Sequence, residues 1–403
     1  MRIVRGRRLT TLVVVLASVC VGALVAQPYL HGLSFVVRSA EMHGTLRRLA
    51  DLDSRTVRER ELTIPTTLGA LRARLYEPAR ARHRAALLVP GLHPAGIDEP
   101  RLVALARQLS ASGLSIVTPD VPELSRLEIT PAIADAIEQA AVWLSSDATL
   151  APDRKVGLMG ISFSGGLSIV AAGRPSMTDH TAFVFAFGGH DDLPRVLRYL
   201  CTGVEEGPRH EVRLGPNAAN DQEPFVRPPD NYGVAVILLG LADRVVPRAQ
   251  VEPLRAAVRR HLAASHLDRV DTPEAEGELA ALRETAKRMP QPSATLLRYV
   301  IDRDVVHLGR RLLPFVGFYG GDRALSASKS PKPSAPVFLL HGSDDNIVPP
   351  VESEYLAEDL RGHAPVRLLL SGAVPGAEAA RPAHVRIGDV MQLAGFWGEL
   401  LSR

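Results

Sequence analysis

Two serines lie in a short segment whose residue types suit a reactive turn. An apolar run over residues 156–159 leads into Gly160-Ile-Ser162-Phe-Ser164-Gly165, and a helical pattern follows. Where a strand turns directly into a helix the backbone is crowded, so only small side chains fit around the residue at the turn. The segment therefore predicts a nucleophilic Ser162, with Gly160, Ser164 and Gly165 as the small residues beside it.

Two other interpretations of this segment remain open. In the first, Ser164 is the nucleophile and Ser162 and Gly166 are its small neighbours, although Ser164 lies two residues further from the apolar strand. In the second, the segment is a Ser/Gly-rich turn without chemistry. A phosphate-binding loop is excluded, because Gly166-Leu167 stands where such a loop has Lys followed by Ser or Thr.

A reactive serine needs a general base, and the base needs a group that orients it. Asp345 follows an apolar run at residues 338–340, and its spacing from His341-Gly342 favours it over Asp344 as the orienting acid. His384 stands in a loop just before the last helical pattern and is the candidate base. The three groups thus occur in the chain order Ser, Asp, His.

Other acids compete with Asp345. Asp191 and Asp192 directly follow the preceding strand and are the first alternatives, although capping the next helix is their more ordinary role. Asp243 lies in a close copy of the acid motif, Leu238-Leu-Gly-Leu-Ala-Asp-Arg-Val-Val-Pro247, but within a helical block. We therefore keep Asp345 as the predicted acid.

Alternating patterns predict an α/β protein with a mostly parallel sheet of about eight strands flanked by helices. Expected strands cover residues 57–64, 71–76, 85–89, 114–118, 155–159, 182–187, 337–340 and 366–370. Expected helices between and after them cover 101–112, 131–145, 167–172, 351–360 and 387–401. A block without strands, with helices at 193–201, 232–242, 251–264, 274–288 and 294–313, predicts an inserted all-helical cap.

The first segment is apolar and carries its charge at one end. Residues 9–37 contain no Asp, Glu, Lys or Arg, and four Arg occur among the first eight residues. Such a segment is long enough to span a bilayer, and the positive-inside rule would leave the rest of the chain extracytoplasmic. A cleaved signal peptide, giving a secreted protein, is the alternative, although Val21-Gly-Ala23 is a poor cleavage site.

The expected organisation has five parts. Residues 1–30 form the membrane anchor or signal segment, and 31–55 a linker or an amphipathic helix on the membrane surface. Residues 56–190 and 331–403 form the two parts of the sheet domain, and 191–330 form the helical cap.

Composition limits the partners and cofactors. Of the 403 residues, 46% are hydrophobic, and the net charge of +3 comes from the four N-terminal Arg. The rest is near neutral, which argues against nucleic acid as the main partner. Cys20 and Cys201 are the only cysteines, and the histidines lack ligand spacing, so we expect no disulfide framework, no metal and no other cofactor. The oligomeric state is not encoded in any of these patterns.

The strand–turn–helix around Ser162, the segment His341-Gly-Ser-Asp-Asp345-Asn-Ile-Val-Pro349 and His384 together resemble the α/β-hydrolase superfamily. The resemblance covers about residues 60–190 and 335–403. It implies Ser162 as nucleophile, His384 as general base and acid, and Asp345 as the group that holds the imidazolium.

The resemblance also implies an oxyanion hole built from the backbone N–H groups of Phe163 and Leu92. The chain departs from the family at two positions. Pro90 stands where the family often has His, and Ser164 stands where it has Gly.

The function implied is a membrane-tethered serine hydrolase that cleaves carboxylic esters, including lipophilic acyl esters, through an acyl-enzyme. One alternative is an amidase or peptidase similar to the prolyl-oligopeptidase-like relatives. The other is a non-catalytic binding protein with the same fold, which the two departures favour.

Overall fold

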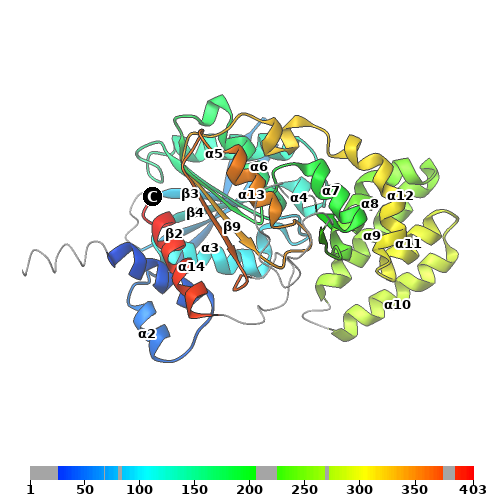
Figure 1. Cartoon of the computed structure of the whole chain (residues 1–403), viewed down its shortest axis with the longest axis horizontal. Helices are drawn as coiled ribbons and strands as arrows, with labels where there is room; N and C mark the ends of the chain where they lie inside the picture. Colours follow the sequence, from blue (N-terminus) through cyan, green and yellow to red (C-terminus); the bar gives the residue numbers. More distant parts are fainter. Residues whose placement is uncertain (1–25, 68, 80–83, 206–224, 268–271, 375–385) are drawn as a thin grey trace, which may run out of the picture.

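Strands and helices alternate along most of the chain and build one eight-stranded sheet with helices on both faces (Figure 1). The computed structural model describes residues 26–67, 69–79, 84–205, 225–267, 272–374 and 386–403. The strands of the sheet are β1 Val57–Thr66, β2 Gly69–Pro78, β3 Ala85–Val89, β4 Ser115–Pro119, β5 Val156–Ile161, β6 Thr181–Phe187, β9 Val337–Gly342 and β10 Val366–Ser371.

The strands lie in the order β1-β2-β4-β3-β5-β6-β9-β10. β2 is antiparallel to both β1 and β4, and the remaining pairs are parallel. The expected α/β fold with a mostly parallel sheet of about eight strands is therefore confirmed.

The central strands are apolar throughout because helices cover both of their faces. Every residue of β3 is buried. Leu87 and Val89 face one hydrophobic core, whereas Ala86 and Leu88 face the other. The first core contains residues of α5 Ala132–Ser146, α6 Phe163–Ala172 and α13 Val351–Asp359, and the second contains residues of α3 Pro100–Ala111 and α14 Ile387–Leu400.

Shorter elements connect these layers. They are α2 Thr45–Asp51, α4 Pro122–Ser125 and the 3₁₀ turns η1 Gly96–Asp98, η2 Pro175–Met177, η3 Arg323–Leu325 and η4 Ala327–Lys329. A further helix covers residues 26–39.

A helical block lies at one end of the sheet, on the right in Figure 1. It contains α7 Leu193–Thr202, the short antiparallel strands β7 Val204–Glu205 and β8 Phe225–Val226, α8 Asn231–Val245, α9 Arg248–Leu267, α10 Thr272–Arg288, α11 Ser293–Ile301 and α12 Val305–Tyr319. The expectation that this block has no strands is therefore wrong at β7 and β8, which are only two residues long. The single helix expected over residues 294–313 is in fact α11 and α12. The break has a local cause, since the Asp304 side chain accepts a hydrogen bond from the His307 N–H and so starts a new helix.

Hydrogen bonds join the two ends of the helical block. The Leu193 N–H donates to the Ser326 hydroxyl at 3.0 Å, and the Ser328 N–H donates to the Asp191 carbonyl at 3.1 Å. The buried Glu352 of α13 accepts hydrogen bonds from the N–H groups of Asp191 and Asp192. The block thus leaves and rejoins the sheet at one place, beside α13.

A cluster of Asp191, Arg195 and Glu352 lies at this junction, with both acids buried and Arg195 half-buried. The Arg195 guanidinium contacts Glu352 at 2.5 Å and Asp191 at 3.1 Å. Burial raises the pKa of Asp191 to about 7, and repulsion by Asp359 and Glu352 adds to this effect, while Arg195 opposes it. One guanidinium between two buried carboxyl groups therefore favours a protonated Asp191.

The predicted membrane anchor is contradicted by the structure. Within the described ranges, none of the helices combines the length and the apolar character that crossing a bilayer requires. Most of the predicted span falls on residues 1–25, which lie outside the described residues. Among the apolar side chains that follow, Phe35, Val36 and Val37 are buried in the protein, and Phe35 packs on Trp397 of α14 with ring centroids 4.3 Å apart. The extracytoplasmic localisation by one N-terminal span is therefore wrong.

We expect Gly398→Ala to lower the free energy of unfolding by about 1–3 kcal/mol, because a Cβ at this position would overlap the Pro28 carbonyl of helix 26–39. Gly395→Ala in the same α14 is the matched control. Nothing lies within 4 Å of its Cβ, so alanine should raise the stability by up to about 1 kcal/mol. Urea unfolding followed by circular dichroism measures both. Equal changes in the free energy of unfolding for Gly398→Ala and Gly395→Ala would contradict the close contact between α14 and helix 26–39.

Asp191→Asn should flatten the dependence of stability on pH. Between about pH 4 and 7 the native wild type holds a proton that the unfolded chain has lost, so its free energy of unfolding falls as pH rises. Asparagine cannot titrate, and the slope should lessen by at most about 1.4 kcal/mol per pH unit.

Asp192→Asn is the control for this experiment. Although burial opposes the shift, Lys329 and the Arg195 N–H lower the pKa of Asp192, so its contribution is lost only as pH falls below about 4. Urea titrations across pH 3–8 separate the two variants. A wild-type slope retained in Asp191→Asn would show that Asp191 is ionised throughout this range.

Candidate active site

Ser162 occupies the sharp turn between β5 and α6. Its backbone has φ 54° and ψ −125°, a left-handed conformation that costs a non-glycine residue about 1–3 kcal/mol. The Ser162 N–H donates to the Phe187 carbonyl of β6 at 2.6 Å, which holds the turn against the sheet. A Cβ at Gly160 would overlap the Ser164 carbonyl, so the sequence needs glycine there. The small residue at position 160 is therefore required by the close packing of β5 against the first turn of α6.

The two serines differ in accessibility. Ser162 is half-buried, whereas Ser164 is fully buried in the first turn of α6. The Ser164 hydroxyl donates to the Pro90 carbonyl at 2.5 Å. The side chain that departs from the family pattern thus joins α6 to the loop after β3.

The loop after β3 lies beside the Ser162 side chain. A Cβ built on Gly91 would lie 3.6 Å from the Ser162 Cβ and 3.4 Å from the Ile161 carbonyl oxygen. Leu92 follows in the same loop and is half-buried. Phe163 is the first residue of α6, so its N–H is one of the first-turn donors that have no acceptor within the helix. The loop that carries Leu92 and the first turn of α6, which carries Phe163, thus both lie next to Ser162.

Asp345 lies in the turn after β9 and is 3% exposed. Its Oδ1 accepts hydrogen bonds from the Ile347 N–H at 2.9 Å and the Val348 N–H at 3.0 Å. A Cβ built on Gly188 would lie 3.4 Å from Asp345 Oδ2 and 3.8 Å from Ser162 Cα. Ser162 and Asp345 therefore border the same space, at the carboxyl ends of β5 and β9, the two parallel strands on either side of β6.

His341 supports the acid turn from inside β9. Burial lowers its pKa, so the ring is neutral. Its Nε2 faces the Val348 carbonyl at 2.9 Å, which requires a proton on Nε2, and its Nδ1 accepts from the Ser353 hydroxyl at 2.6 Å. This fully buried imidazole has a structural role.

His384, the predicted base, lies among residues 375–385, outside the described residues. The rival acids are all described. Asp191 pairs with Arg195, and the Asp192 side chain caps α7 by accepting from the Arg195 N–H at 2.9 Å. Asp243 is an exposed residue of α8, within 3.5 Å of Arg244.

His190 lies behind the first turn of α6. Its ring stacks on Phe163, with centroids 5.2 Å apart and planes at 4°. Its Nε2 donates to the Leu325 carbonyl at 2.8 Å, and burial lowers its pKa. A neutral histidine thus packs against the residue whose N–H is a candidate oxyanion donor.

Two contacts of the site were not apparent from the sequence. The Tyr232 hydroxyl of α8 donates to the Leu92 carbonyl at 2.6 Å, and Arg227 donates to the carbonyls of Ser343 and Asp345 at 3.0 and 3.3 Å. The only local signal is Asp230, a typical N-cap residue that marks the start of α8.

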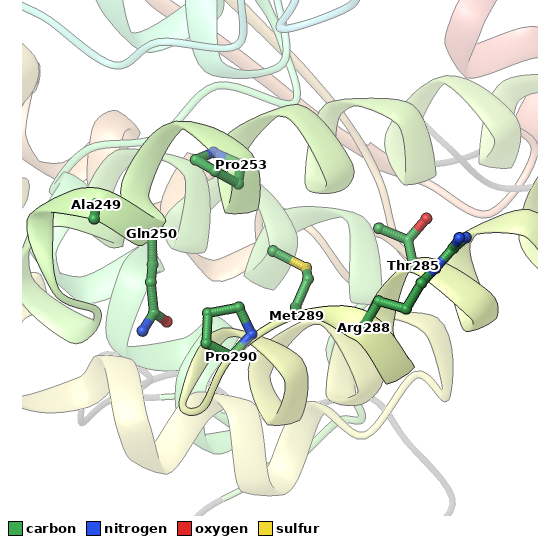
Figure 2. A pocket seen from close by; sticks show the side chains of 7 residues that line it. All are labelled: Ala249, Gln250, Pro253, Thr285, Arg288, Met289 and Pro290. Carbon is green, nitrogen blue, oxygen red and sulfur yellow. The ribbon is translucent and has the colours of Figure 1, made fainter.

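A cavity of 290 Å³ lies elsewhere, in the helical block (Figure 2). Its lining residues come from α9, α10 and the turn after α10: Ala249, Gln250, Pro253, Thr285, Arg288, Met289 and Pro290. The candidate site residues are not among them. In the described part of the chain, no group of three His, Cys, Asp or Glu side chains is placed to hold a metal ion.

No family model matches the chain, and no curated protein matches it. Among solved structures, EstE1, a thermophilic carboxylesterase cloned from a metagenomic library, is similar over 86% of this chain and 90% of its own, with 16% identity and a TM-score of 0.45. An esterase of Pyrobaculum calidifontis is similar over 91% of both chains, with 14% identity and a TM-score of 0.42. The acylaminoacyl peptidase of Pyrococcus horikoshii matches 87% of this chain and 42% of its own, with 12% identity and a TM-score of 0.41.

Sequence identities of 12–16% and TM-scores of 0.41–0.45 are too low to assign an activity to this chain. The assignment of the fold follows from features of this chain: the eight-stranded sheet with helices on both faces, the strained serine between β5 and α6, and the buried acid after β9. These features are those of the α/β-hydrolase fold, which the chain therefore adopts.

Proposed function

We propose that this protein is a serine hydrolase that cleaves carboxylic esters through an acyl-enzyme on Ser162. The observation that carries the proposal is the strained, half-buried Ser162, which borders both the Gly91–Leu92 loop and the space beside Asp345. Strain at a non-glycine residue persists only where the surrounding structure enforces it, and such residues cluster at active sites. The fully buried Ser164 lacks this exposure.

In the proposed reaction, Ser162 Oγ attacks the carbonyl carbon of the ester while His384 takes the hydroxyl proton. The carbonyl oxygen becomes an oxyanion, which the N–H groups of Phe163 and Leu92 stabilise. The C–O bond to the alcohol then breaks, and His384 returns the proton to the leaving alkoxide. Water, deprotonated by His384, attacks the acyl-enzyme, and the carboxylic acid leaves as Ser162 regains its proton.

Asp345 has the properties required of the orienting acid in this scheme. Two backbone N–H groups fix its Oδ1. Its Oδ2 lies 3.4 Å from the place that a Cβ on Gly188 would occupy, and the Ser162 Cα lies 3.8 Å from the same place. A buried carboxylate held in this way keeps an imidazole in one tautomer and stabilises the imidazolium. The neighbouring Asp344 is exposed and has no such backbone support in the described contacts.

Labelling with a fluorophosphonate probe tests the nucleophile. Wild type should react, and Ser162→Ala should not, because the probe bonds to an activated serine oxygen. Ser164→Ala is the matched control. It should retain labelling but unfold more easily by about 1–3 kcal/mol, since the buried Pro90 carbonyl loses its donor. Labelling that survives Ser162→Ala and disappears in Ser164→Ala would assign the nucleophile to Ser164, and an unreactive wild type would support a binding protein.

Asp345→Asn should lower kcat for p-nitrophenyl butyrate by about 10,000-fold, because an amide no longer holds the imidazole in the productive tautomer. The amide oxygen can still accept from Ile347 and Val348, so the fold should persist. Asp344→Asn, at the adjacent exposed position, should leave kcat within about two-fold of wild type. Steady-state rates, with circular dichroism as a folding check, decide the matter. Similar rates in both variants would exclude Asp345 as the acid.

A further inference from the structure

One short segment of the helical block contacts both sides of the candidate site. At one end, Arg227 donates to the carbonyls of Ser343 and Asp345, and the Asp230 N–H donates to the Asn346 carbonyl at 2.9 Å. At the other end, the Tyr232 hydroxyl reaches the loop after β3. The segment 227–232 thus spans from the acid turn to the loop that carries Leu92.

The carbonyls of that loop are held from different elements. The Pro90 carbonyl accepts from the Ser164 hydroxyl of α6 at 2.5 Å, and the Leu92 carbonyl accepts from the Tyr232 hydroxyl of α8 at 2.6 Å. The peptides that contain these carbonyls flank the Gly91–Leu92 peptide, which carries the proposed donor N–H. Fixing a peptide on each side limits rotation of the one between them.

Tyr232 is itself fixed at its backbone. It lies in the first turn of α8, and its N–H donates to the Asp230 side chain at 2.8 Å. Asp230 in turn is bonded to the acid turn through Asn346. Arg227 is anchored by an ion pair with the largely buried Glu205 at 2.7 Å. Because the tyrosine ring is rigid, a fixed backbone at Tyr232 also restricts the position of the hydroxyl that is bonded to the Leu92 carbonyl.

We propose that Tyr232 is a positioning residue of the oxyanion hole, through which the helical block holds the Leu92 N–H in its catalytic orientation. This inference rests on the proposed function. Tyr232 acts through Leu92. Its hydroxyl donates its proton to the Leu92 carbonyl, so Tyr232 orients the Leu92 N–H and does not itself bind the oxyanion. The helical block is then part of the catalytic machinery in addition to any role in substrate selection.

Tyr232→Phe tests the role, since it removes the hydroxyl and keeps the ring. We expect kcat for p-nitrophenyl butyrate to fall about 10- to 100-fold with KM changed less than about three-fold, because an oxyanion donor acts mainly in the transition state. The matched control is Tyr319→Phe, which removes a hydroxyl from the same helical block, where the ring packs against Gly240 of α8. This control should retain wild-type kcat.

Hydrogen exchange provides a readout that needs no turnover. In Tyr232→Phe, the amide N–H groups within residues 91–95, other than Pro94, which has none, should exchange faster than in wild type. Tyr319→Phe should not change them. If Tyr232 only stabilised the fold, its replacement would raise hydrogen exchange throughout α8. It would then not lower kcat selectively while leaving KM nearly unchanged.

The outcomes distinguish this inference from the function on which it rests. A reactive wild type together with Tyr232→Phe at wild-type kcat, or with unchanged exchange in residues 91–95, overturns the positioning role alone. A wild type that neither reacts with fluorophosphonate nor turns over esters overturns the proposed function and this catalytic role together.

Discussion

The left-handed backbone of Ser162 is the constraint on which the rest of the site depends. It persists because the Ser162 N–H is bonded to β6 and because α6 is buried along its whole length, with Gly160 leaving room for the first turn. The packing of two strands and one helix therefore outweighs a local cost of about 1–3 kcal/mol. The loop of Leu92 and the turn of Asp345 are placed relative to this fixed point.

Local pattern was sufficient to predict most elements of the fold and the turn that carries Ser162. Strands buried on both faces give unbroken apolar runs, and helices on a sheet repeat their apolar residues with a helical period. The one clear error in a helix came where a short-range signal was overlooked: Asp304 caps a new helix in a segment expected to be continuous. The apolar N-terminal run was misread for a different reason, since residues such as Phe35 that pack on protein have the same pattern as residues that face lipid.

The contacts that complete the site could not be read from the sequence. The bond between Tyr232 and Leu92 and those from Arg227 to the acid turn join positions more than a hundred residues apart. Each depends on where the helical block is seated on the sheet, which periodicity does not encode. Ser164 is a related case, because its departure from the family pattern has a structural explanation only once the Pro90 carbonyl is seen beside it.

The junction at which the helical block leaves and rejoins the sheet has a consequence for folding. β6 and β9 are parallel neighbours, yet residues 188–336 separate them in the chain. Joining strands so distant in sequence carries a large loop-closure entropy and slows folding. Because Leu193 is bonded to Ser326 and Asp191 to Ser328, a folded block brings its own ends together and presents β9 to β6 as if the intervening chain were short.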